Sequence, residues 1–115
     1  MSTASQSAPD VRASGGFELI ERSSGQFEAR GALTFATARR GRELARAAFQ
    51  ATAAREIHVN CSGITASDSA GMSVLLDWLA LAKRSGRALR FDSLPRQVQA
   101  IARISDVLEL LQQGV

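Results

Sequence analysis

Apolar and polar residues alternate along two neighbouring stretches near the start of the chain, and each alternation predicts a β-strand. The first stretch begins at Phe17–Ile20 and the second covers residues 26–33, with Gly25 between them. Successive side chains of a strand point to opposite faces, so the alternation gives each strand one apolar and one polar face. Because a glycine between two such runs marks a turn, we expect the two strands to form a hairpin.

A third alternation leads into the stretch around which the rest of the chain is organised. Apolar Ile57 and Val59 alternate with polar residues over Arg55–Cys61, which predicts a strand. Small and polar residues follow over 66–71, and then comes Met72–Arg84, an apolar run without Gly or Pro. We therefore expect 66–71 to be a strand-to-helix turn. The first turn of such a helix exposes unpaired N–H groups and the positive end of the helix dipole.

The rest of the pattern alternates helices with strands. Helical spacing of apolar residues covers 37–54 and resumes after Pro95, while residues 88–91 predict a short strand. Such alternation after an opening hairpin predicts a mixed sheet with helices packed against it. We expect one α/β domain over 16–115, with four to five strands and about four helices. Residues 1–15 hold few large apolar residues and are expected to form a disordered N-terminal tail.

The helix predicted after the turn has two different faces. One face is apolar and should pack on the sheet, because at about 3.6 residues per turn it collects Gly71, Val74, Leu75, Trp78, Leu81 and Ala82. The opposite face mixes apolar with small polar residues. Single apolar residues are common on surfaces, but an apolar patch with a polar rim is typical of a protein contact. We therefore predict a partner interface formed by Ser69, Met72, Ser73, Leu76 and Ala80.

The composition excludes several kinds of site. The chain has one cysteine, Cys61, and one histidine, His58, so neither an intrachain disulfide nor a multi-histidine metal site can form. Neither residue belongs to a nucleophile motif, and no phosphate-binding glycine motif occurs. No apolar run approaches the ~20 residues of a membrane span, and no signal-peptide pattern begins the chain. We expect a cytoplasmic protein without enzymatic activity, metal or cofactor.

Basic residues slightly outnumber acidic ones, and many of them cluster. The formal net charge is +3. Arginines gather at Arg39, Arg40, Arg42, Arg46 and Arg55. A nucleic-acid surface would also need base-stacking aromatic residues or a known binding motif, and only Phe49 lies nearby, so we expect no nucleic-acid partner. A solvated helix face explains the cluster; an acidic protein partner or an anionic membrane surface is the alternative.

Particular residues resemble a known family. The stretch Asp68-Ser69-Ala70-Gly71 before an apolar helix resembles the Asp-Ser/Thr-x-Gly signature of STAS domains, the fold of the anti-sigma-factor antagonists. Positions further along resemble the MlaB-type branch of this family, namely Trp78, Ala82, 87–91, Leu94, Pro95, 100–107 and 109–111. The resemblance covers the chain from Phe17 to Leu111. One departure is Asn60, which stands where many relatives carry Asp.

The resemblance implies a function. MlaB-type proteins are the cytoplasmic STAS subunits of the Mla phospholipid ABC transporter of Gram-negative bacteria, which serves outer-membrane lipid asymmetry. The chain is thus expected to bind the transporter's ATPase, to regulate or stabilise it, and to meet the inner membrane only through that complex. The alternative is an anti-sigma-factor antagonist that is switched by phosphorylation of Ser69. A third, weaker alternative is a module that binds an acidic ligand or a nucleotide.

The motif residues Asp68, Ser69 and Gly71 admit more than one role. Serine is favoured at helix starts because its oxygen accepts hydrogen bonds from backbone N–H groups. Ser69 is therefore expected to cap the helix, to contact a partner or accept a phosphoryl group, or to combine these roles. Asp68 is expected either to cap the helix or to shape a regulatory serine site.

Overall fold

The computed structural model describes residues 16–115, and the tail expected over 1–15 lies outside this range. The elements are, in chain order, β1 (Glu18–Ser23), β2 (Gln26–Leu33), the 3-10 helix η1 (Phe35–Thr37), α3 (Ala38–Ala51), β3 (Glu56–Ser67), α4 (Ser69–Arg84), β4 (Ala88–Asp92), α5 (Arg96–Ile104) and α6 (Leu108–Gln113). The four strands form one sheet in the order β1-β2-β3-β4. β1 and β2 pair antiparallel, and the other pairs are parallel. The mixed α/β fold expected from the sequence is confirmed.

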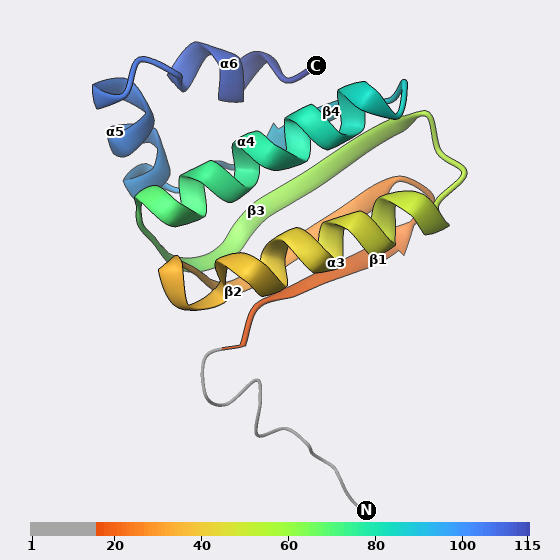
Figure 1. The fold of residues 1–115 in the computed structure, drawn as a ribbon, viewed down its shortest axis with the longest axis horizontal. Helices are drawn as coiled ribbons and strands as arrows, with labels where there is room; N and C mark the ends of the chain where they lie inside the picture. Colours follow the sequence, from red (N-terminus) through yellow and green to blue (C-terminus); the bar gives the residue numbers. More distant parts are fainter. Residues whose placement is uncertain (1–15) are drawn as a thin grey trace, which may run out of the picture.

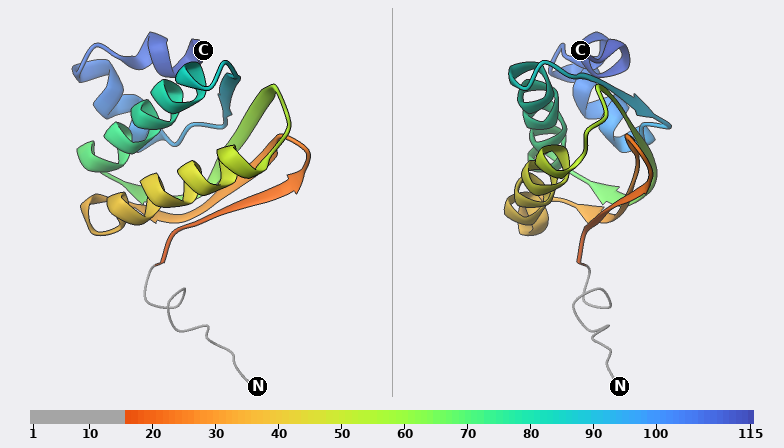
Figure 2. Two further views of the ribbon diagram at one scale, coloured as in Figure 1. Left: turned by 45° about the vertical axis from the view of Figure 1, so that its right-hand side comes forward. Right: turned by 90° about the vertical axis from the view of Figure 1, so that its right-hand side faces the viewer.

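The helices are distributed unevenly around the sheet (Figure 1). α3 and α4 lie side by side across one face, and the right-hand view of Figure 2 places both on the same side of the strands. α5 packs against α4, and α6 packs against the outer strand β4. Beyond α6, Val115 and Leu89 exchange two backbone hydrogen bonds of 3.0 and 3.1 Å, which cover part of the β4 edge.

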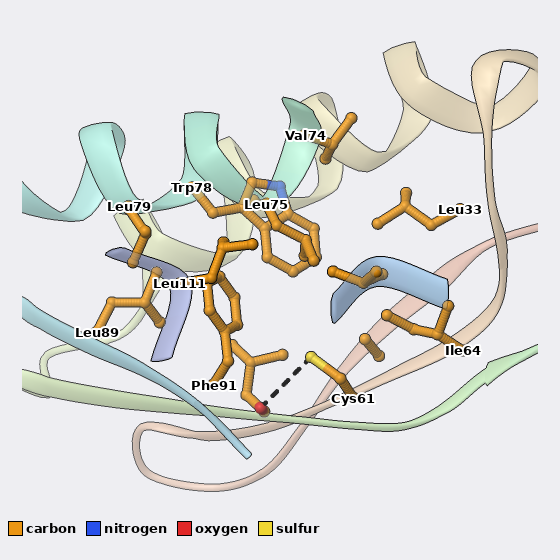
Figure 3. Packing of buried hydrophobic residues seen from close by; sticks show 14 of the residues in the cluster. Leu33, Cys61, Ile64, Val74, Leu75, Trp78, Leu79, Leu89, Phe91 and Leu111 are labelled. Atoms are coloured by element: carbon orange, nitrogen blue, oxygen red, sulfur yellow. Dashed lines mark hydrogen bonds between the residues drawn. The ribbon is translucent and has the colours of Figure 1, made fainter. Parts of the chain in front are cut away.

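Trp78 is the centre of the core between α4 and the sheet (Figure 3). Its side chain is 1% exposed, as expected for the inner face of the helix. The ring centroids of Phe17, Phe49 and Phe91 lie 6.1, 6.3 and 6.4 Å from that of Trp78. Its indole Nε1–H donates a hydrogen bond of 3.2 Å to the carbonyl oxygen of Gly41, so α3 and α4 are joined inside the core.

One residue of the expected outer face of α4 is inside the protein instead. Met72 is 6% exposed, so its placement on the solvent side is wrong. Leu79, seven residues further on, is 3% exposed and lies on nearly the same line along the helix. The cause is α5, which packs on one flank of α4 while α3 packs on the other and the sheet lies beneath. The residue pattern of α4 alone does not reveal that second flank.

Candidate functional site

Asp68 joins the start of α4 to the turn that follows β2. β3 ends at Ser67, and Asp68 is the extended N-cap residue of α4. Its Oδ1 accepts a hydrogen bond of 2.9 Å from the backbone N–H of Gly71. Its Oδ2 accepts one of 3.1 Å from the backbone N–H of Phe35 in η1. One carboxylate therefore caps the helix and also holds a segment 33 residues away in the sequence.

These two hydrogen bonds also determine the charge at the site. The pKa of Asp68 is lowered, first by the hydrogen bond from the N–H of Gly71 and then by that from Phe35, because both donors stabilise the ionised form. The carboxylate is therefore ionised at neutral pH, where it lies at the positive end of the α4 dipole. Any negative group added to Ser69 would be placed next to this existing charge.

Ser69 is the first residue of α4, and its side chain is exposed. Of the roles considered for this serine, the capping role belongs to Asp68, whose carboxylate accepts the N–H bond at this helix end. The Ser69 hydroxyl is therefore placed on the surface of the first helical turn, where a partner or a modifying enzyme can reach it.

Gly71 allows α4 to press against the end of β2. A Cβ atom built on Gly71 would collide with the carbonyl oxygen of Leu33 and would lie 2.6 Å from the Oγ of Ser67. The glycine of the motif is thus required by packing. The same corner is fixed from a second side, because the backbone N–H of Ser67 donates a hydrogen bond of 3.1 Å to Oε1 of Gln97 in α5.

Phe35 is an exposed apolar residue near the site that sequence reasoning missed. Its side chain is 83% exposed, whereas the other four phenylalanines are at most 8% exposed. The turn that carries it is held by Thr37, whose Oγ1 accepts a hydrogen bond of 3.0 Å from the N–H of Thr34 and donates one of 2.8 Å to the carbonyl of Ala32. The available signal was a phenylalanine between two threonines that fits neither the strand alternation nor the helical spacing.

The remaining residues of the predicted interface differ in exposure. Ser73 and Ala80 are exposed, and Leu76 is half-buried with its side chain packed against the core. Ser69, Ser73, Leu76 and Ala80 are called the outer face of α4 below. Because Asp68 binds the Phe35 turn to the first turn of this helix, the exposed Phe35 lies next to the end of the outer face that begins at Ser69.

Between residues 16 and 115, the structure offers neither a cluster of metal ligands nor an ionised thiol. Over this range, no group of three His, Cys, Asp or Glu side chains could hold a metal ion. Cys61 is buried, and burial followed by the charge of Asp92 raises the pKa of its thiol to about 12. A thiol that stays protonated is a poor nucleophile. Within the same residues, no helix is long and apolar enough to cross a bilayer.

The fold and the site together define a class of protein, namely an α/β domain with a mixed four-stranded sheet and an Asp-Ser-x-Gly turn at the start of a central helix. A sequence model of the family described as "Mlab, STAS domain" matches residues 19–112. The chain therefore belongs to this family, and the family expected from the sequence is confirmed.

Two solved structures are similar to this chain. The anti-sigma factor antagonist SpoIIAA in its unphosphorylated form matches with a TM-score of 0.57 and 16% identity, over 76% of this chain and 82% of that one. A sulfate transporter family protein from Wolinella succinogenes matches with a TM-score of 0.60 and 13% identity, over 84% and 77%. Identities this low show a shared fold alone. No curated protein matches the sequence.

Proposed function

We propose that this protein is a non-enzymatic binding subunit of an MlaB-type phospholipid ABC transporter, and that it holds the transporter's ATPase in its assembled state. The observation that carries the proposal is the exposed Phe35, which Asp68 holds beside the start of the outer face of α4, in a chain that belongs to the Mlab STAS family. Lipid transport itself would belong to the complex, so this subunit would meet the membrane only through its partner.

The chemistry of that surface suits a protein contact. An exposed aromatic residue on an ordered turn offers a large apolar area at low entropic cost, and such residues often dominate binding energy. Small side chains such as Ser73 and Ala80 on the outer face of α4 allow a partner helix to approach closely. A subunit of this kind stabilises the ATPase conformation to which it binds more tightly.

Ser69 is proposed to regulate this contact. A phosphate there would add about two negative charges next to the ionised Asp68. The positive helix end tolerates this charge in the isolated protein, so folding should survive. Removing that charge from water at an apolar interface is unfavourable, so binding should weaken. Ser69→Glu should therefore melt close to the unmodified protein and lose the partner.

The second candidate function is that of an anti-sigma-factor antagonist switched at Ser69. The observation in its favour is the exposed serine in the first turn of α4. Both candidates use the same surface and differ in the partner that binds it. An ABC-type ATPase supports the first, and a kinase-type anti-sigma factor supports the second.

The test is affinity purification of the full chain from its host, followed by mass spectrometry of the proteins retained. We expect an ABC-type ATPase to co-purify with the parent chain and with the control Ser62→Glu, whose exposed serine lies on the opposite face of the sheet. Phe35→Ala, Ser69→Glu and Ser73→Arg should each lose it while melting normally. If all three variants retain the ATPase, the binding surface lies elsewhere. Recovery of a kinase-type anti-sigma factor instead selects the second function.

A further inference from the structure

We propose that the groove between α3 and α4 is a second contact surface, which receives acidic side chains of a protein partner. The groove encloses about 260 Å³. Trp78 contributes to its lining, together with Arg42, Arg46, Asp77, Ala80, Leu81 and Arg84. Three arginines from two helices thus line one hollow, together with a single acidic residue.

The charges in this groove are only partly balanced. Nε of Arg42 lies 2.7 Å from Oδ2 of Asp77, and this ion pair joins α3 to α4. Within residues 16–115, neither Arg46 nor Arg84 forms an ion pair. The groove therefore presents two uncompensated guanidinium groups, which can bind carboxylates in a planar, two-bonded geometry.

The shape and surroundings of the groove favour a protein over a membrane or a small anion. A bilayer surface is broad, whereas these guanidinium groups line a hollow with apolar Leu81 beside them. The carboxylate of Asp77 would repel a compact dianion, but a helix carrying separated acidic residues can place them beside Arg46 and Arg84. Ala80 belongs both to the groove and to the outer face of α4, so one partner can cover both surfaces.

The identity of this partner as the ATPase rests on the proposed function, but the preference for an acidic partner rests on the arginines of the groove alone. The first experiment therefore uses a glutamate-rich helical peptide and the ¹⁵N-labelled chain, followed by nuclear magnetic resonance. The single tryptophan gives one indole N–H signal, which comes from a buried ring that borders the groove from the core side. We expect the peptide to shift this signal and the backbone signals around Leu81.

The matched variants test whether the groove itself is responsible. Arg46→Glu/Arg84→Glu should abolish the peptide shifts. The control Arg90→Glu/Arg103→Glu makes the same change in net charge at exposed sites away from the groove, and Arg103, like Arg84, lies in the last turn of its helix. This control should keep the shifts. If inorganic phosphate or anionic phosphatidylglycerol vesicles shift the groove signals and the peptide does not, the proposal of an acidic protein segment is wrong.

The second experiment uses the co-purified ATPase and measures association rates at 50 and 300 mM salt. Rim charges act mainly on association rates and on their salt dependence. Arg46→Glu/Arg84→Glu should slow association about tenfold at low salt and flatten its salt dependence, and the control should do neither. Unchanged kinetics in the groove variant, with binding still lost in Phe35→Ala, would overturn this inference alone. Absence of any ATPase binding would refute the proposed function, while the peptide result would still decide the groove.

Discussion

Asp68 offers the sharpest test of how the site is built, because one carboxylate makes two separable hydrogen bonds. Asp68→Ala removes both acceptors. Asp68→Asn keeps one oxygen that can cap the N–H of Gly71, but it turns an NH₂ group toward the N–H of Phe35. Two donors cannot pair, so this variant should keep the helix cap and release the Phe35 turn.

The expected energies follow from these two bonds. Loss of an N-cap side chain costs about 1 kcal/mol. Loss of an exposed hydrogen bond to a charged acceptor costs about another 1 kcal/mol, below the roughly 1.5–3 kcal/mol of less exposed bonds to charged groups because water competes for both partners. Asp68→Ala should therefore lose about 2 kcal/mol of unfolding free energy and Asp68→Asn about 1 kcal/mol. For a domain of this size, 1 kcal/mol lowers the melting temperature by about 4–8 °C.

The pH dependence gives an independent measurement of the same carboxylate. The pKa of Asp68 is lower in the folded protein than the usual value of about 3.9 for an unfolded chain. Its contribution is therefore complete above about pH 5 and is lost as the pH falls through the folded pKa. Urea melts followed by Trp78 fluorescence between pH 7 and pH 3 should show this loss in the parent and a smaller loss in both variants.

Two results would refute this reasoning. If Asp68→Asn is as stable as the parent, the bond to Phe35 contributes nothing in solution. If Asp68→Asn is less stable but binds the partner as tightly as the parent, then the position of the Phe35 turn does not matter for binding. The exposed control Asp106→Asn lies in the connection before α6 and should change neither property.

Three further outcomes are expected. Trp78→Ala should lose about 3–5 kcal/mol in a urea melt followed by circular dichroism, because it removes the centre of the core, and a loss below 1 kcal/mol would contradict this placement. Gly71→Ala should lose about 1–3 kcal/mol through its clash with Leu33, although helix propensity alone favours alanine by about 1 kcal/mol, so a stabilised variant would refute the packing argument. Cys61 should resist iodoacetamide at pH 8 in the folded protein and react once urea unfolds it; rapid labelling of the native state would contradict its burial and its pKa of about 12.

Much of the fold was predictable because it depends on local pattern. The alternation around Ile57 and Val59 predicted the central strand, and both side chains are buried. The inner face of α4 was also correct around Trp78, since helical spacing alone determines which residues share a face. These features need no knowledge of which elements become neighbours in space.

The errors arose where tertiary neighbours decide the outcome. Met72 is buried because α5 returns to pack beside α4, and that helix begins over twenty residues later in the chain. Capping by Ser69 and capping by Asp68 were both open from the sequence, and the structure gives the cap to Asp68, whose two oxygens bind the N–H groups of Gly71 and Phe35. The exposure of Phe35 depends on a turn closed by Thr34 and Thr37. Such a turn has neither strand nor helix periodicity, so the pattern of apolar residues does not predict whether Phe35 is buried.

The two proposed contacts share Ala80 but extend to opposite ends of α4, and the distance between those ends leads to a last prediction. Ser69 and Arg84 are the first and last residues of the helix, so at about 1.5 Å per residue they lie about 22 Å apart. That distance is well beyond the screening length of about 8 Å at physiological salt, so a phosphate on Ser69 is not neutralised by Arg84. Modification should therefore act through desolvation at its own end of the helix.

Distant sites with no shared contacts change free energies additively, within about 0.5 kcal/mol. In titrations with the ATPase, the losses of binding energy in Ser69→Glu and Arg84→Glu should add in the double variant. A double variant that binds much better than this sum would mean that the two charges communicate, and that the surface of α4 acts as a single electrostatic site.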